Sequence, residues 1–323
     1  MTGGTGFIGS HLVEALLAQG HEVRCLVRDT RRLAWISGLP SVTIAQGGMD
    51  EPRSLLEAMR GVDQIYHVAG LTRARAAGEF FRINGEGTRH LVRACLEAPG
   101  GPRRLVHLSS LAAVGPMPMA TACAEDALPR PVSPYGRSKL QGETAVLAVR
   151  DRLHVTVLRP PVVYGPRDRG VLEVARWVAR GLLPMLAGPS RALSVCYVQD
   201  LVTALLTAGA AQVPSGEIFH VAGDGAFTWE QVGGALGEAL GVQPTPVRIP
   251  LPMLLALATG ADAWAWLTRR PQYFSRGKVR EAAGHWLCDT GKARRQLGVV
   301  PGVGLRQGAD VTVKWYREAG WLQ

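Results

Sequence analysis

The first nine residues of the chain, MTGGTGFIG, place glycines at every third position, 3, 6 and 9, immediately before a helix-like segment. Gly3 allows a tight turn at the end of a strand, Gly6 lets backbone N–H groups approach a pyrophosphate, and Gly9 permits close helix packing. The predicted helix over 10–19 directs its positive N-terminus at the same anion. A strand-like segment ends about 18 residues after the loop, as in dinucleotide-binding folds. We therefore interpret the following residues as cofactor-binding: Gly3, Gly6, Phe7, Ile8 and Gly9.

Strand-like and helix-like segments alternate up to about residue 165. The predicted strands cover 22–27, 64–68, 105–109 and 155–158, and the predicted helices cover 10–19, 54–59, 87–95 and 139–149. Apolar strands that alternate with helices predict a parallel sheet covered on both faces. We expect an α/β fold with a doubly wound parallel sheet, of the Rossmann type, over residues 1–165.

The alternation changes after residue 165. Helices are predicted over 171–180 and 229–240, and strands over 192–197 and 217–221, while 248–286 is rich in Leu, Ala and Trp. We expect residues 192–224 to return to the dinucleotide-binding domain. Residues 166–191 and 225–323 are expected to form a smaller substrate-binding lid.

The glycine loop begins unusually close to Met1. In a dinucleotide-binding fold a buried strand of about five residues leads into this loop and forms the centre of the sheet. Met1 stands where the last residue of that strand, a valine, is expected. We interpret the first strand as missing, and hypothesise that a GTG valine codon was taken as the start, so that the written sequence is clipped.

Composition narrows the class of protein. Hydrophobic residues make up 47% and charged residues 19%, as in ordinary globular chains. The net charge of +10 is spread along the sequence without a basic-aromatic array, which favours a phosphate-bearing ligand over nucleic acid. The five cysteines form no CxxC pair and fit no zinc spacing, so we expect reduced, packed thiols and no metal site.

Membrane insertion is not predicted. The longest apolar stretch, residues 251–267, contains Asp262 and Gly260, and is too short and too polar for an integral span. The N-terminus has no basic segment followed by an apolar run, so no secretory signal is recognised. These features predict a cytoplasmic protein with a small-molecule substrate.

The tip of the predicted strand over 22–27 bears on cofactor choice. An NAD enzyme usually places an acid there to hold the adenosine ribose, whereas an arginine suits a 2′-phosphate. The sequence offers Arg28 followed by Asp29. We favour NADP, bound by Arg28, with NAD as the alternative in which Asp29 holds the ribose and Arg28 is solvated.

A tyrosine and a lysine four residues apart, Tyr135 and Lys139, open a predicted helix and share one face of it. The pKa of a phenol is near 10, so little of it is the basic phenolate at neutral pH. A nearby ammonium favours the phenolate. Tyr135 is therefore a candidate to exchange a proton with a carbinol oxygen while a nicotinamide exchanges hydride. Ser110, at the end of the predicted strand over 105–109, is placed to hydrogen-bond the same oxygen.

These motifs together resemble the extended short-chain dehydrogenase/reductases, also called the NAD-dependent epimerase/dehydratase family. The resemblance covers nearly the whole chain and is carried by TGGTGFIGSHLV, HVAG (67–70), INGEGT (83–88), SSLAAVG (109–115), SPYGRSK (133–139), LRPPVVYGPRD (158–168), YVQDL (197–201), KARRQLG (292–298) and WYREAGWL (315–322). It implies that Ser110, Tyr135 and Lys139 form a catalytic triad. It also implies a homodimer.

The resemblance assigns further positions around the cofactor. Ala69 and Gly70 would line it, Pro160 to Val163 would border the nicotinamide, and Met49 would lie beside the adenine. Asn84 would be a structural neighbour rather than a catalyst. Many relatives have Gly-Asp-Leu where this chain has Gly47-Gly48-Met49, so adenine binding would lose one side-chain hydrogen bond, worth about 1 kcal/mol.

Two departures bear on the substrate. Relatives that act on nucleotide-sugars usually carry an asparagine where this chain has Val162, and an arginine where it has Leu193, both contacting the diphosphate. Apolar side chains cannot replace these contacts, although Arg191 lies close in sequence. The apolar segment with Trp264, Trp266 and Trp286 is similar to the branch of dihydroflavonol reductases and 3β-hydroxysteroid dehydrogenases; the alternative is that these tryptophans are ordinary lid core.

The leading hypothesis is therefore an NAD(P)-dependent oxidoreductase that transfers hydride to or from a hydroxyl or ketone of a largely apolar small molecule. A nucleotide-sugar epimerase or dehydratase with bound NAD is the alternative. A third reading, a redox-sensing binding protein that lost activity, conflicts with the presence of both Tyr135 and Lys139.

Overall fold

The computed structural model describes residues 1–270 and 274–322. Its central sheet is parallel, with the strand order β2 (Val42–Gln46), β1 (Val23–Val27), Thr2, β3 (Gln64–His67), β4 (Arg104–Leu108), β5 (His154–Arg159) and β10 (Glu217–His220). Thr2 joins the two parts of this sheet through bridges to Leu26 and His67. The predicted doubly wound α/β fold is confirmed.

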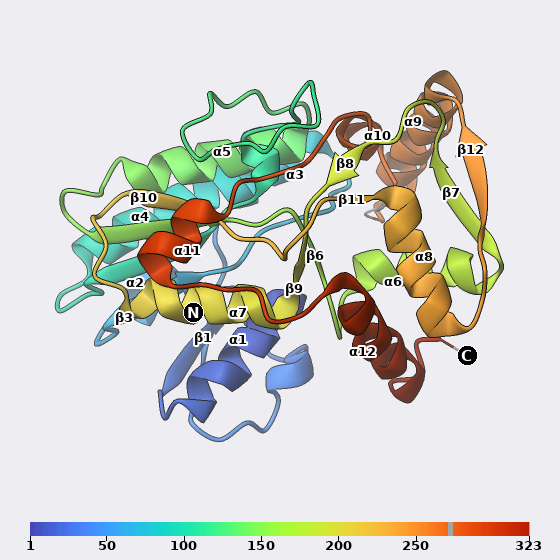
Figure 1. Cartoon of the computed structure of the whole chain (residues 1–323). Coiled ribbons are helices and arrows are strands. Elements are labelled where there is room, and N and C mark those ends of the chain that lie inside the picture. The colour runs from blue at the N-terminus through green and yellow to red at the C-terminus, as the bar shows by residue number, and fades with distance from the viewer. Residues whose placement is uncertain (271–273, 323) are drawn as a thin grey trace.

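Helices cover both faces of this sheet (Figure 1). One face packs against α1 (Phe7–Ala18), α7 (Val198–Ala210) and α11 (Gly291–Leu297), and the other against α2 (Pro52–Ala58), α4 (Gly87–Glu97) and α5 (Pro134–Leu147). Neighbouring residues of β4 point to opposite faces: Val106 packs in the core beneath α1, α7 and α11, and Leu105 packs in the core beneath α2, α4 and α5. Apolar side chains on both faces explain why the strands read as continuous hydrophobic runs.

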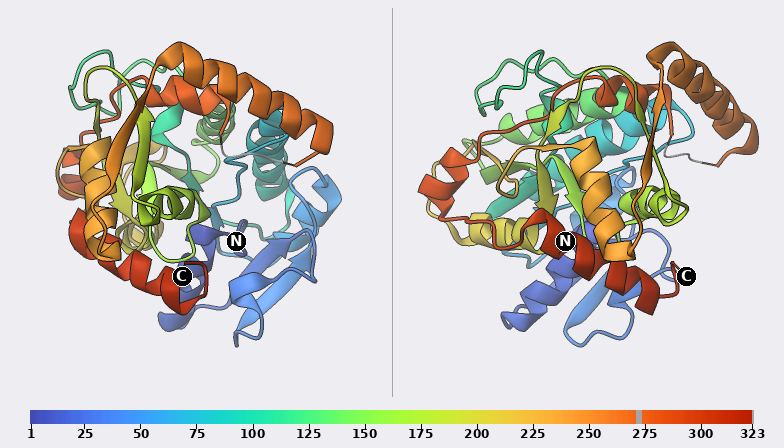
Figure 2. Two further views of the ribbon diagram at one scale, coloured as in Figure 1. Left: turned by 90° about the vertical axis from the view of Figure 1, so that its right-hand side faces the viewer. Right: turned by 45° about the vertical axis from the view of Figure 1, so that its right-hand side comes forward.

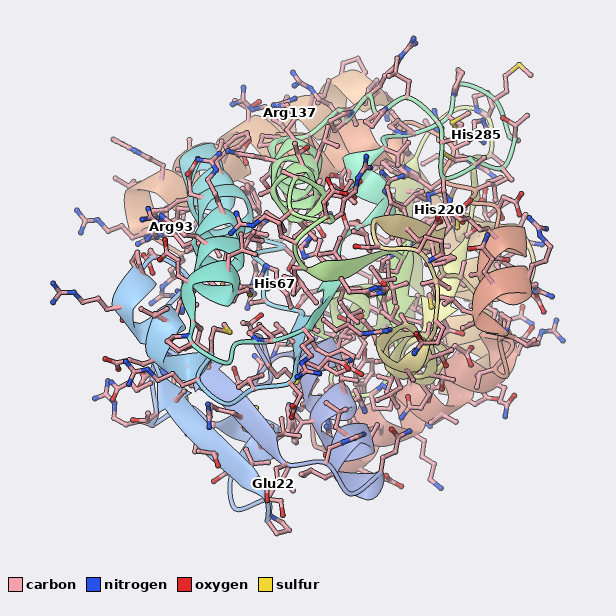
Figure 3. The ribbon with its side chains drawn as sticks, turned by 90° about the vertical axis from the view of Figure 1, so that its left-hand side faces the viewer. Glu22, His67, Arg93, Arg137, His220 and His285 are labelled. Carbon is pink, nitrogen blue, oxygen red and sulfur yellow. The ribbon has the colours of Figure 1, made fainter. Side chains whose placement is uncertain are left out.

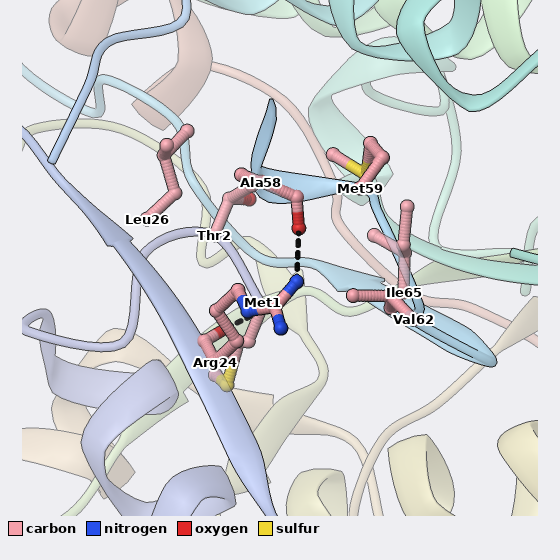
Figure 4. A pocket seen from close by; sticks show the side chains of 8 residues that line it. All are labelled: Met1, Thr2, Arg24, Leu26, Ala58, Met59, Val62 and Ile65. Atoms are coloured by element: carbon pink, nitrogen blue, oxygen red, sulfur yellow. Dashed lines mark hydrogen bonds between the residues drawn. The ribbon is translucent and has the colours of Figure 1, made fainter. Parts of the chain in front are cut away.

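The first strand is reduced to Met1 and Thr2. The carbonyl of Met1 accepts from the amide of Leu26 at 2.9 Å, and the amide of Thr2 donates to the carbonyl of Tyr66 at 3.1 Å. Below them a pocket opens between β1 and β3, lined by Met1, Thr2, Arg24, Leu26, Ala58, Met59, Val62 and Ile65 (Figure 4). The Arg24 guanidinium reaches across it to the carbonyl of Ala58 at 3.1 Å.

The second half of the chain adds three two-stranded pairs beside the central sheet. Two are parallel and one is antiparallel: β6 (Val162–Tyr164) with β9 (Val195–Tyr197), β7 (Leu182–Leu186) with β12 (Thr245–Ile249), and β8 (Ala192–Leu193) with β11 (Phe227–Thr228). A separate core forms where α6 (Arg169–Ala179), α8 (Trp229–Leu240) and α12 (Leu305–Glu318) meet. Helices α6 and α8 and strands β7 and β12 lie on the right of Figure 1, and β6 and β9 lie nearer its centre.

Helix α8 has the bounds that the sequence predicts, because both of its ends carry local signals. Thr228 and Gln231 form a capping box at its start, and Gly241 adopts a left-handed conformation at its end. By contrast, the short strands β7 and β12 and the helix α7 were not predicted as such.

The remaining helices are short, with one exception. They are α3 (Ala77–Phe80), α10 (Arg276–Ala282), the π-helix η2 (Phe81–Glu86) and the 3₁₀ helices η1 (Ala34–Ile36) and η3 (Leu111–Ala113). The exception, α9 (Leu251–Thr268), is an 18-residue helix on the outer edge of the molecule (Figure 2). Among the described residues, no helix has the length and hydropathy needed to cross a membrane.

Candidate active site

The glycine loop has the geometry of a phosphate cradle. Gly3 has a positive φ of 77°, and a Cβ there would lie 2.6 Å from the amide nitrogen of Ala69. A Cβ at Gly9 would overlap the carbonyl oxygen of Gly3, so this glycine serves the loop itself rather than contact with the sheet. Helix α1 begins at Phe7 without a side-chain cap, which leaves its first amides free to bind an anion. The loop therefore fits a dinucleotide pyrophosphate.

The segment after β3 lies against this loop and approaches Lys139. The amide of Ala69 donates to Oγ1 of Thr2 at 3.2 Å. A Cβ at Gly70 would lie 3.6 Å from Nζ of Lys139. Asn84 holds the next residue, accepting from the amide of Leu71 at 2.7 Å and donating to its carbonyl at 3.0 Å. The expected structural role of Asn84 matches this geometry.

Ser110, Tyr135 and Lys139 come together where β4 ends and α5 begins. Pro134 and the Ser133 cap start α5, and the Ser133 hydroxyl accepts from the amide of Gly136 at 2.9 Å. The side chain of Ser110 hydrogen-bonds that of Tyr135. Burial raises the pKa of Tyr135 above its ordinary value, outweighing the lowering effects of Lys278 and Ser110. We expected a lowered pKa from Lys139, and the direction found here is the opposite.

Lys139 is buried and turned towards the end of β4. Its ammonium donates to the carbonyl of Leu108 at 2.6 Å. Burial lowers its pKa to about 8, opposed by the carboxylate of Glu143 one helical turn away. Glu143 is also buried, paired with Arg159 and accepting from the Ser109 hydroxyl at 2.8 Å. The buried pair and the hydrogen bond fix β4, β5 and α5 relative to each other beneath the site.

A pair of buried histidines supports the site from within the sheet. His67, drawn in the interior in Figure 3, hydrogen-bonds Oγ1 of Thr2 at 2.7 Å and Oγ1 of Thr88 at 2.9 Å. Its ring centroid lies 4.9 Å from that of His107. Burial, followed by the charge of Lys139, lowers the pKa of His67 to about 3, so this ring is neutral at physiological pH.

A further lysine, Lys278 on α10, lies against the candidate tyrosine. Its Nζ is 5.0 Å from the centroid of the Tyr135 ring and 2.8 Å from a carboxylate oxygen of Glu281. Glu281 in turn accepts from the Ser133 hydroxyl that caps α5. Sequence reasoning missed Lys278, because nothing in the RGKVREA segment marks it.

At the tip of β1, Arg28 is exposed and makes no hydrogen bond or ion pair with another described residue, and its Cγ lies close to Gly48. Asp29 is instead engaged by Arg31 at 3.0 Å and Arg32 at 3.5 Å. Hydrogen bonds from Arg31 lower the pKa of Asp29. Met49, expected beside the adenine, buries its side chain in the core with Leu55 and Leu91.

Val162 and Leu193 line one apolar pocket, although they belong to different strands. The other residues around it are apolar or aromatic: Tyr164, Val171, Val174, Val195, Trp229, Val232, Leu236, Leu305 and Ala309. Arg191 does not enter this pocket; its Nε donates to the carbonyl of Ala283 at 2.9 Å. The two positions that set this chain apart from nucleotide-sugar enzymes therefore meet at one apolar surface.

The three tryptophans of the C-terminal segment separate into two groups. Trp286 packs partly buried against two cores and donates from Nε1 to the carbonyl of Glu281 at 2.6 Å. Trp264 and Trp266 are 59% and 74% exposed, so the lid-core interpretation is wrong for these two.

The five cysteines are free and buried, as expected, and no metal-binding cluster is found among the described residues.

A sequence model described as the NAD dependent epimerase/dehydratase family matches residues 1–222. The chain is 34% identical over 325 residues to a ceramide reductase of Caulobacter vibrioides, covering 100% of this chain and 95% of that protein. It is 32% identical over 338 residues to the sterol demethylase protein B of Methylococcus capsulatus, covering 100% and 99%.

Among solved structures, the fold is similar to that of a dTDP-glucose 4,6-dehydratase of Streptomyces venezuelae with NAD bound. The TM-score is 0.80 at 27% identity, and the similarity covers 99% of this chain and 97% of that one. The chain belongs to the NAD-dependent epimerase/dehydratase family, the extended short-chain dehydrogenase/reductases. It is an NAD(P)-dependent enzyme of that family, and its relatives include reductases, dehydrogenases and dehydratases.

Proposed function

We propose that this enzyme is an NADP-dependent reductase or dehydrogenase that acts on a ketone or hydroxyl of a lipid-like substrate. The observation that carries the proposal is that Val162 and Leu193, at the two positions where nucleotide-sugar relatives hold the diphosphate, form one apolar surface. A nucleotide-sugar diphosphate placed there would lose its water without gaining polar partners, at a cost of several kcal/mol. An alkyl or ring surface would instead gain from burial against the same side chains.

The names of three relatives agree with an apolar substrate. Besides the ceramide reductase and the sterol demethylase protein, the chain is 30% identical to a ketoreductase of a farnesyl-dihydroquinoline oxide from Stigmatella aurantiaca, covering 99% of this chain and 96% of that protein. A ceramide, a sterol and a farnesylated ring each have a large apolar body.

The proposed chemistry assigns each side chain one task. The bound nicotinamide would supply or accept the hydride. Because burial raises its pKa, Tyr135 is held as a neutral phenol that can donate a proton to a ketone oxygen during reduction. The Ser110 hydroxyl, already hydrogen-bonded to Tyr135, would bind the same oxygen. The Lys139 ammonium beside Gly70 would stabilise the tyrosinate that remains after proton transfer.

Lys278 is proposed as a positioning residue for Tyr135. Its ammonium over the ring stabilises negative charge on the phenol oxygen. Its ion-pair partner Glu281 connects α10 to the start of α5 by accepting from the Ser133 hydroxyl. The elements that bring it there belong to residues 225–323. We propose that these residues, together with 166–191, form the substrate-binding lid on a dinucleotide-binding unit of residues 1–165 and 192–224.

Arg28 is proposed to select NADP over NAD. It is exposed at the carboxyl end of β1 with no partner among the described residues, and a 2′-phosphate there would give it a charge-assisted hydrogen bond. Asp29, the alternative ribose ligand, already forms ion pairs with Arg31 and Arg32.

The test is a direct assay of purified enzyme. NADPH oxidation is followed with long-chain keto lipids, 3-ketosteroids and a prenylated ketone, and the alcohol product is identified by mass spectrometry. Tyr135→Phe serves as the inactive control. Interconversion of a nucleotide-sugar without net NADPH consumption would overturn the proposal and favour the epimerase or dehydratase alternative.

A further inference from the structure

Helix α9 exposes an uninterrupted apolar face. Met253, Leu257, Trp264 and Leu267 follow one another at intervals of four, seven and three residues, so they lie on one side of the helix. Their exposed fractions are 56%, 52%, 59% and 69%. Single exposed apolar residues are normal on protein surfaces, but a continuous stripe along a whole helix indicates a docking surface.

The opposite side of α9 faces the protein. Ala258 and Ala265 are buried there, and α10 is the main element that α9 packs against within the described residues. The only charged residue of the helix, Asp262, is half-buried and bound to Nε of Arg276 at 3.0 Å. Its charge is therefore compensated inside the structure, and the outward stripe carries no charge.

Basic residues flank this helix. Arg248 precedes it by a few residues, and Arg269 and Arg270 follow its last turn, all three exposed. Between residues 248 and 280 the sequence has six basic residues and only one acidic residue, Asp262. An apolar stripe between basic ends matches the surface of an anionic bilayer, with phosphates beside an apolar interior.

We propose that α9 docks this enzyme on the surface of an anionic lipid bilayer, lying in the plane of the membrane with its apolar stripe among the acyl chains. Trp264, on the stripe, suits the boundary between headgroups and acyl chains, where an indole has both an apolar body and a polar N–H. The arginines at either end contact lipid phosphates. An in-plane helix is consistent with the finding that no described helix can span a membrane.

The helix is connected to the candidate active site through α10. Helix α9 packs on α10, and α10 places Lys278 over the ring of Tyr135. Figure 2 shows α9 on the rim of the molecule, away from the central sheet. Docking through α9 would therefore bring the lid close to a pool of membrane lipid. The docking itself does not depend on the proposed reaction, because it is measured without turnover.

The experiment is co-sedimentation with vesicles of phosphatidylcholine alone or containing about one third phosphatidylglycerol. The enzyme should bind the anionic vesicles, and the double variant Trp264→Ser/Leu267→Ser should bind at least about tenfold more weakly. A matched control is Trp177→Ser/Leu128→Ser, whose residues are exposed at 45% and 73% on other segments. The control should bind like the unmodified enzyme. Arg269→Gln/Arg270→Gln should reduce the preference for anionic vesicles.

Two outcomes would overturn the proposal. One is equal vesicle binding by the enzyme and by Trp264→Ser/Leu267→Ser, provided that circular dichroism and thermal unfolding show both to be folded. The other is no binding to either vesicle, together with a dimer in sedimentation velocity that the double variant dissociates. That second result would assign the stripe to contact between two copies of the chain. Either result leaves the NADPH assay unaffected, so failure of docking and failure of the proposed reaction are distinguishable.

Discussion

The ammonium of Lys278 lies 5.0 Å from the centroid of the Tyr135 ring, and this contact joins the C-terminal part of the chain to the helix that carries the proposed proton donor. Glu281 completes the connection, since it binds Lys278 and accepts from the hydroxyl of Ser133. The cap of α5 and the electrostatics of Tyr135 therefore both depend on how α10 is placed.

Replacement of Lys278 should change the pH dependence of catalysis. The ammonium lowers the pKa of Tyr135, so Lys278→Gln removes that effect and the pKa rises. In the oxidative direction the phenolate is required, so the acidic limb of the kcat profile should move to higher pH. Arg280→Gln, on the same helix and exposed, is the control and should leave the limb in place. If the acidic limb of the kcat profile does not move in Lys278→Gln, Lys278 has a structural role and does not affect the pKa of Tyr135.

Tyr135→Phe should retain the fold and the cofactor site while losing turnover. The change removes the proton donor but keeps the ring between Lys278 and the site. We expect kcat to fall roughly 100- to 10,000-fold, the usual worth of a positioned acid, with NADPH affinity within about threefold. Steady-state rates and a fluorescence titration of NADPH measure the two quantities. A variant with near-normal kcat would show that another group delivers the proton.

Lys139→Met should reveal the cost of the buried ammonium. Because its folded pKa is about 8, below the unfolded value of 10.5, the unfolded chain binds more protons between these pH values. Stability contributed by this group therefore rises as pH increases from about 8 to 10.5, by up to about 3 kcal/mol. Urea unfolding at pH 7 and pH 10 measures the free energy of unfolding of the enzyme and of Lys139→Met. The difference between the two should shift in favour of the enzyme at pH 10. A difference independent of pH would contradict the lowered pKa.

Arg28→Ala should weaken NADPH binding on the order of 10- to 100-fold and NADH binding by no more than about threefold, because only the 2′-phosphate loses a charge-assisted hydrogen bond. The comparison is Arg31→Ala, a neighbouring arginine whose side chain is 89% exposed and bound to Asp29. Isothermal titration with both cofactors measures the ratio. Equal losses for NADPH and NADH in Arg28→Ala would refute the selective role.

The sequence predicted best what local signals determine. Gly3, with its positive φ, and the strand ends at Ala69 and Ser110 follow from turn chemistry and hydrophobic periodicity, and the structure brings them to one edge of the sheet. Lys278 could not be predicted, because its position depends on how α9 and α10 pack on the rest of the chain. The same reason applies to Trp264 and Trp266, which composition alone suggested to be core.

Val162 and Leu193 are an intermediate case. Comparison with the family pattern marked each as unusual, but only the fold shows that both face the same pocket. The strands β7 and β12 were not predicted because each is short and mixes proline with apolar residues, without the alternation that identifies a half-buried strand.

The reduced first strand has a thermodynamic consequence. Among the described residues, the backbone of Met1 and Thr2 pairs the β1–β2 unit with the rest of the sheet, and the Arg24 side chain bridges the pocket beneath them. The proposed dinucleotide site spans this seam, with the glycine loop and Ala69 on one side and Arg28 on the other. Cofactor binding and cohesion of the sheet are therefore linked functions, and saturating NADPH should slow amide hydrogen exchange in β1 and β2 more than in β4 and β5.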